Sequence, residues 1–61
     1  MNMDTELRLI SAQEASKILR VSRNTIYDLW DEGRLGYWCI SGTRRTNLIA
    51  IREFLERERC K

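Results

Sequence analysis

Side chains that could bind a polyanion gather in two short stretches of the chain. The first stretch, Lys17 to Asn24, holds three cations and no acid, and the second is the pair Arg44-Arg45. Arginine can donate two hydrogen bonds to a guanine edge, asparagine can pair bidentately with adenine, and cations can also contact phosphates. A polyanion is therefore expected to meet one face of the molecule rather than its whole surface.

Size and composition exclude other kinds of function. A chain of 61 residues with 43% hydrophobic and 33% charged residues makes one globular domain, with no room for a substrate cavity. It has no histidine and no glycine-rich phosphate loop, so we expect neither catalysis nor a cofactor. Cys39 and Cys60 match neither a zinc site nor a disulfide framework, and we expect reduced thiols.

The N-terminus carries acids where a secretory signal carries basic residues and then an apolar run. No apolar stretch approaches the roughly 18 residues of a membrane span. We therefore expect a soluble, cytoplasmic protein. Residues 1–6 lack periodicity and are expected to form a flexible N-terminus, followed by one domain over residues 7–59 and a short end at 60–61. Leu7, Leu9 and Ile10 could form a short strand.

Two helices joined by a short turn are predicted to position the first basic stretch. Ser11 followed by Glu14 is a capping-box pattern, so the first helix should begin at Ala12. Its expected buried face consists of Ala12, Ala15, Ile18 and Leu19, which fall at helical spacing.

The second helix is predicted to begin at Arg23 after a Ser22 cap and to end near Glu32, with Gly33 in the left-handed region. Its inward stripe is Ile26, Leu29 and Trp30, and its outward residues are Arg23, Asn24, Tyr27, Asp28 and Asp31, with Thr25 at the boundary. Arginine in the first turn and acids in the last oppose the helix dipole, at a cost of about 0.3–1 kcal/mol each. That arrangement is understandable if the N-terminal end approaches a polyanion. It is uninformative if these are ordinary surface charges, which contribute little.

After Gly33, a β-prone run over residues 35–40 and a turn at Ser41-Gly42-Thr43 predict a β-hairpin, with the Arg44-Arg45 pair beginning the returning strand. We expect the Trp38 and Ile40 side to help close the core and Tyr37 to be partly exposed. A last helix follows, with Ile51, Phe54 and Leu55 as its apolar stripe. It could begin at Leu48 after an Asn47 cap, but a start near Ala50 is favoured.

The chain from about residue 9 to 57 resembles the small winged-helix DNA-binding domains of the MerR and excisionase type. The resemblance rests on Ala15 and Leu19 in the first helix, and on Val21-Ser22-Arg23, Thr25-Ile26-Tyr27 and Gly33-Arg34-Leu35. It implies a mainly α winged helix-turn-helix whose second helix enters the major groove while the wing touches the backbone or minor groove. By position it implies these DNA-contacting residues: Arg20, Ser22, Arg23, Asn24, Thr25, Tyr27, Thr43, Arg44 and Arg45, with Lys17 and Arg34 at the rim.

Arg20 departs from the family pattern, because glycine is common at that position of the turn. It predicts either backbone strain or a basic side chain aimed at a phosphate.

The resemblance also implies a role. We expect an excisionase, a recombination directionality factor that binds and bends double-stranded DNA near an attachment site and directs integrase-mediated excision. The implied partners are DNA, a cognate integrase and neighbouring copies of the protein, and the implied setting is bacterial or phage-encoded. Because no long helix is available for dimerisation, we expect a monomer in free solution. The alternatives are a stand-alone MerR-like transcriptional regulator and a winged-helix module that binds only protein.

Overall fold

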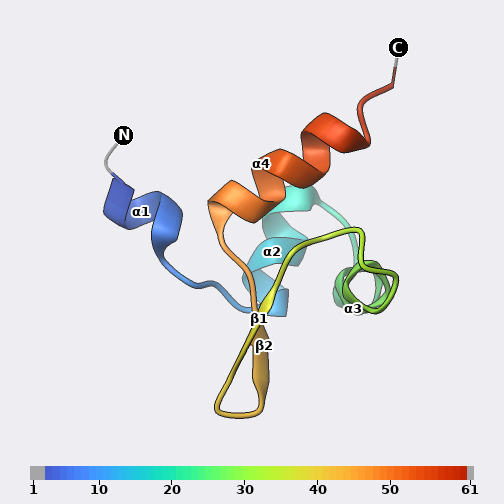
Figure 1. Cartoon of the computed structure of the whole chain (residues 1–61). Helices are drawn as coiled ribbons and strands as arrows, with labels where there is room; N and C mark the ends of the chain where they lie inside the picture. Colours follow the sequence, from blue (N-terminus) through green and yellow to red (C-terminus); the bar gives the residue numbers. More distant parts are fainter. Residues whose placement is uncertain (1–2, 61) are drawn as a thin grey trace.

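Four helices and one β-hairpin make up the part of the chain that this computed structural model describes, residues 3–60. In order they are α1 (Met3–Leu7), α2 (Ala12–Leu19), α3 (Arg23–Asp31), β1 (Trp38–Ile40), β2 (Thr43–Arg45) and α4 (Leu48–Arg57). Figure 1 shows α4 lying across α2, α3 to one side, and the hairpin projecting away from the helices. The fold is the predicted one, a mainly helical helix-turn-helix with a β-hairpin wing.

The N-terminal end differs from the prediction. α1 gives helical structure to residues 3–7, where the sequence predicts a frayed end and the start of a strand, and residues 1–2 and 61 lie outside the described part. A helix this short is not readable from periodicity, because contact with another element has to stabilise it. Here Arg52 of α4 pairs with Glu6 of α1. Of the expected strand, only Ile10 pairs, in an isolated bridge with Thr46.

The starts of α2 and α3 are the predicted ones. Ser11 Oγ accepts the Glu14 backbone N–H at 3.2 Å, and Glu14 Oε1 accepts the Ser11 N–H at 3.1 Å, which completes the capping box. Ser22 Oγ caps α3 by accepting the Thr25 N–H at 3.1 Å. Gly33 has φ of 73°, the left-handed conformation predicted for the residue after α3. These features depend on short sequence patterns, so they are predictable from sequence.

The start of α4 contradicts the favoured boundary near Ala50. The helix begins at Leu48, because Asn47 is its cap: Asn47 Oδ1 accepts the Ala50 N–H at 2.8 Å, and its backbone carbonyl accepts the Ile51 N–H at 3.1 Å. Asn47 is buried, so its side chain is committed to this cap.

The core lies where α2, α3 and α4 meet beside the base of the hairpin. The predicted stripe of α3 is buried, and Trp30 is only 1% exposed. Two predicted core residues are not buried, since Ile18 is 48% and Leu55 is 51% exposed. Small residues are buried on two of the helices, Ser16 on α2 and Ala50 on α4. The core residues are Ile10, Ala12, Ala15, Ile26, Leu29, Trp30, Leu35, Ile51 and Phe54, with Leu19 and Leu48 packed against them.

Candidate nucleic-acid interface

The N-terminal end of α3 presents polar side chains to solvent. Arg23 and Asn24 occupy the first turn and are exposed, and neither side chain has a hydrogen bond or ion pair to another described residue. The side chains of Ser22 and Thr25 interact with each other, since their hydroxyl oxygens lie 2.8 Å apart at the start of the helix. The structure therefore brings four predicted residues, the cap and the first three residues of α3, to one end of the helix. Ser22 and Thr25 order the turn that carries Arg23 and Asn24.

Arg20 lies in the turn that precedes this end. It is the C-cap of α2 with φ of 59° and ψ of 44°, a left-handed conformation that a non-glycine residue seldom adopts. The strain that the sequence suggested is present, and the exposed side chain has no ion-pair partner among residues 3–60. A cation held at this energetic cost lies three residues before Arg23, in the turn that joins the two helices.

The C-terminal end of α3 is different, because its acids pair with cations from elsewhere in the fold. Asp31 Oδ1 accepts a hydrogen bond from Arg44 of the wing at 2.8 Å. Glu32 pairs with Arg34 at 3.3 Å, and Arg34 also pairs with Glu58 at the end of α4. These pairs supply a tertiary explanation for acids that oppose the helix dipole.

Arg34 is therefore engaged within the molecule rather than free at the rim of an interface. Hydrogen bonds to Glu58 and Glu32 raise the pKa of Arg34 above its ordinary value. Its backbone carbonyl also accepts a hydrogen bond from Arg57 at 2.6 Å. Together these contacts attach the end of α4 to the loop that follows α3.

The wing has two unlike faces, and the prediction for them is wrong in one respect and confirmed in another: the Trp38 side does not close the core, but Tyr37 is partly exposed, at 39%. Strand register places Trp38 opposite Arg45, Cys39 opposite Arg44 and Ile40 opposite Thr43. Directly opposed residues share a face, so Cys39 and Arg44 lie on one side and Trp38 and Ile40 on the other. The sequence predicts that the Trp38 side closes the core, but Trp38 is 46% and Ile40 is 49% exposed.

The face that turns toward α3, which we call the inner face, carries Tyr37, Cys39 and Arg44. The Tyr37 ring lies 5.6 Å from that of Trp30, and Trp30 in turn meets Tyr27 edge-on at 5.5 Å. The Arg44 guanidinium lies 5.4 to 5.6 Å from all three ring centroids. This cluster gives the physical reason why the Trp38 side does not close the core, because Arg44 and Tyr37 already cover the Trp30 ring.

The outer face of the wing carries Trp38, Ile40, Thr43 and Arg45. The side chain of Arg45 has no ion pair or hydrogen bond to another described residue. The tip is a tight turn in which Ser41 and Gly42 both have positive φ, 52° and 78°. Sequence reasoning placed glycine there but gave Trp38 and Ile40 no part in an interface. Exposed apolar residues beside a free cation make this face a candidate contact surface that the sequence pattern did not signal.

The predicted site residues therefore fall into three groups. Arg20, Arg23, Asn24 and Arg45 lack partners among the described residues, and Thr43 is exposed beside the wing tip. Ser22 and Thr25 build the cap. Tyr27 and Arg44 belong to the aromatic cluster between α3 and the wing.

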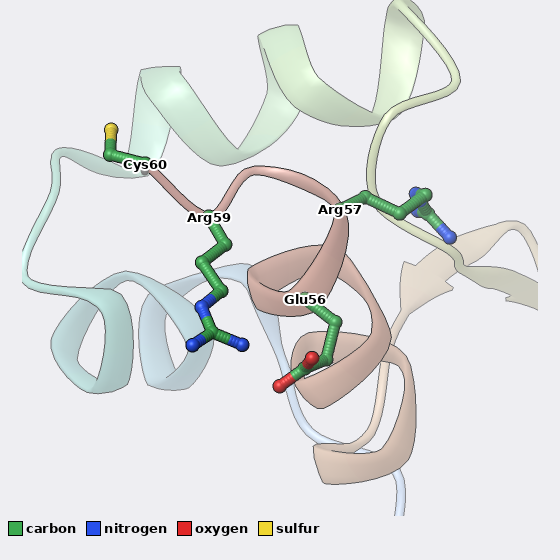
Figure 2. A pocket seen from close by; sticks show the side chains of 4 residues that line it. All are labelled: Glu56, Arg57, Arg59 and Cys60. Carbon is green, nitrogen blue, oxygen red and sulfur yellow. The ribbon is translucent and has the colours of Figure 1, made fainter.

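One pocket of the described chain lies outside this interface, at the end of α4. It has a volume of about 600 Å³ and is lined by Glu56, Arg57, Arg59 and Cys60. Figure 2 shows Glu56 and Arg59 extending to one side of the chain while Arg57 extends away from them, so these groups do not converge on a point. Within residues 3–60 no group of three potential metal ligands occurs, and none of the helices there has the length and apolar character to cross a membrane.

Comparison with known proteins adds the family. A family model described as a helix-turn-helix domain matches residues 9–59, which is most of the chain. No curated protein and no solved structure matches it. The matched region includes α2, α3, the wing and α4, so it contains every residue of the candidate interface. The chain belongs to the helix-turn-helix domain family and is a small, sequence-specific DNA-binding protein.

Proposed function

We propose that this protein is an excisionase: it binds and bends double-stranded DNA near an attachment site and directs an integrase toward excision. Helix α3 enters the major groove by its N-terminal end, where Arg23 and Asn24 meet base edges. Arg20 contacts phosphate beside that groove, and the wing meets the adjoining backbone or minor groove through Thr43 and Arg45.

One observation carries the orientation of DNA on the protein. The cations at the N-terminal end of α3 have no partners among the described residues, whereas the acids at the C-terminal end pair with Arg44 and Arg34. Free cations are available to replace the counterions of DNA, and paired charges are not. The N-terminal end is therefore the end that faces the duplex.

The outer face of the wing supports a protein that deforms its target. Trp38 and Ile40 are about half exposed and lie beside Arg45 and Thr43. Proteins that bend DNA often combine a cation that enters the minor groove with apolar side chains that wedge between base steps.

Binding and bending are tested first. Wild-type protein selects a duplex from a random-sequence pool at about 50 mM salt, where phosphate contacts are strongest. Circularly permuted fragments carrying the selected site are then compared for mobility. We expect a bend of at least about 20°. Failure to shift any duplex at this salt concentration would remove the DNA-binding proposal.

The recombination role has its own test. An attachment-site plasmid is incubated with the cognate integrase, with and without the protein, and excised circles are quantified. We expect excision to depend on the protein and integration to be unaffected or reduced. Binding without any change in the direction of recombination leaves a transcriptional regulator as the function. Neighbouring copies on the site are expected to give stepwise shifted bands.

A further inference from the structure

We propose that Arg44 is a positioning residue that holds the wing against the C-terminal half of α3, so that the two DNA-contacting elements act as one rigid surface. Contact with phosphate is then made by its neighbour Arg45. The inference rests on the proposed DNA-binding function, and it separates two adjacent arginines to which the sequence assigned the same role.

The guanidinium of Arg44 contacts one acid and three aromatic rings. The guanidinium donates a hydrogen bond to Asp31 Oδ1 at 2.8 Å. It lies 5.4 Å from the ring centroid of Tyr27 and 5.6 Å from those of Trp30 and Tyr37, within the distance of about 6 Å at which a cation is attracted to a ring face. Only 31% of the side chain is exposed.

The partners of Arg44 lie on α3 and in the segment just before β1, so the contacts of this one side chain connect α3 to the wing. Asp31, Tyr27 and Trp30 belong to α3, while Tyr37 directly precedes β1. Arg44 on β2 therefore joins the wing to α3 through charge and ring contacts at once. The hydrogen bond to Asp31 also raises the pKa of Arg44 above its ordinary value. Stability from a raised arginine pKa is present at all pH values below the ordinary one, so the connection holds through the neutral range.

The wing needs such a connection. Each of its strands has three residues, and an isolated two-stranded hairpin is marginally stable in water. Its base is fixed by Thr46, whose backbone pairs with Ile10 and whose hydroxyl donates to the Gly36 carbonyl at 2.8 Å. Beyond the base, the Arg44 cluster is the contact that fixes the angle of the hairpin relative to α3.

Arg45 provides the matched comparison. It follows Arg44 on β2 but lies on the outer face, without an ion pair or ring contact among the described residues. An arginine already bound to an acid releases few counterions on binding DNA, whereas a free arginine releases about 0.9 per phosphate contact. The two arginines should therefore affect the salt dependence of binding differently.

The first experiment measures that difference. DNA affinity of wild type, Arg44→Ala and Arg45→Ala is determined from about 50 to 200 mM salt, with a duplex selected by the wild-type protein. For Arg44→Ala we expect about a three- to tenfold loss at every salt concentration, with an unchanged slope of log affinity against log salt. For Arg45→Ala we expect the slope to fall by about 0.9. A slope change for Arg44→Ala equal to that for Arg45→Ala would overturn the proposal.

The second experiment uses no DNA, so it separates this inference from the proposed function. Amide hydrogen exchange of residues 38–45 is measured in wild type, Arg44→Ala, Arg45→Ala and Asp31→Asn. Asp31→Asn keeps the size of the side chain and leaves every cation in place, so it gives a reading even if Arg44→Ala fails to fold. We expect faster exchange in the wing for Arg44→Ala and Asp31→Asn, and wild-type exchange for Arg45→Ala. Unchanged wing exchange in Asp31→Asn contradicts the proposal, whereas absence of DNA binding by wild type contradicts only the proposed function.

Discussion

The two ends of α3 are built in opposite ways. At the N-terminal end, Arg23 and Asn24 are exposed and have no partners among the described residues, and order comes from a local cap. At the C-terminal end, Asp31 and Glu32 each pair with a cation from another element or loop. One end of a nine-residue helix is left available to a ligand, and the other is used to assemble the fold.

This difference indicates where a small DNA-binding domain keeps its stability. The aromatic cluster, the wing and the end of α4 all attach at or beyond Tyr27, so the C-terminal half of α3 serves as scaffold. The N-terminal half can then hold charges that oppose the helix dipole, because the rest of the molecule compensates for them. Substitutions at the two ends should therefore fail in different ways, by loss of folding at one end and by loss of binding at the other.

The largest expected effect is at the scaffold end. Trp30→Ala removes a ring that is 1% exposed and that meets Tyr27, Tyr37 and Arg44. Such truncations cost about 3–5 kcal/mol, comparable with the whole stability of a small domain. We expect a chain that is largely unfolded at 25 °C by circular dichroism.

Trp30→Phe is the control for that prediction. It keeps a ring and removes an indole N–H that is buried without an acceptor among the described residues. We expect Trp30→Phe to remain folded. Equal loss of structure in both variants would mean that the site does not tolerate any change of shape, and a folded Trp30→Ala would contradict a scaffold role for this end.

The second effect is at the open end and concerns binding. Arg23→Glu places an acid at the proposed groove contact, and we expect about a 100-fold loss of DNA affinity with little change in the melting temperature. Arg59→Glu makes the same change in net charge at the end of the chain, where Figure 2 places Arg59 beside Glu56. If the two variants lose equal affinity by mobility shift, then α3 has no special role in recognition.

A third effect concerns the cap that orders the open end. Ser22→Ala removes the hydroxyl that accepts the Thr25 N–H, and such caps contribute about 1 kcal/mol. We expect that loss in urea unfolding, together with weaker DNA binding because Arg23 and Asn24 lie on the turn that frays. Ser22→Asn, which can still cap, should restore both properties. If the free energy of unfolding of Ser22→Ala equals that of wild type, then the packing of α3 alone determines the residue at which this helix begins.

The smallest effect has opposite signs for stability and binding. Arg20→Gly removes the strain of a left-handed arginine, so we expect stability to rise by at most about 1 kcal/mol, while the slope of binding against salt falls by about 0.9. Gly33→Ala makes the opposite change, because it places a side chain at a residue with positive φ, where the added Cβ would meet open space. We expect the free energy of unfolding to fall by about 1 kcal/mol and DNA binding to be unchanged. Thermal melts of both variants measure the change in stability, and salt titrations measure the change in the slope of binding. Arg20→Gly with an unaltered salt slope would remove Arg20 from the interface.

Sequence alone predicts the features that depend on neighbours in the chain. The capping box at Ser11, the cap at Ser22, the buried stripe of α3 and the left-handed Gly33 each follow from residues within about one helical turn. These are also the features that define a helix-turn-helix, which is why the fold was predictable.

The features that sequence missed depend on which element packs against which. Period-two alternation correctly divided the wing into two faces, but only the position of Trp30 decides which face turns inward. Likewise Arg44 and Arg45 are indistinguishable in the sequence, and their difference comes from Asp31, thirteen residues away in the chain. A candidate site built from adjacent like charges therefore needs the tertiary structure before roles can be assigned to its members.

The salt dependence of DNA binding by the wild-type protein tests the central claim most directly. If the open end of α3 and the outer face of the wing meet DNA, Arg20 and Arg45 should each displace counterions from a phosphate. The slope of log affinity against log salt is then about −1.8 for two phosphate contacts. A slope indistinguishable from zero, or no binding at about 50 mM salt, would contradict the account.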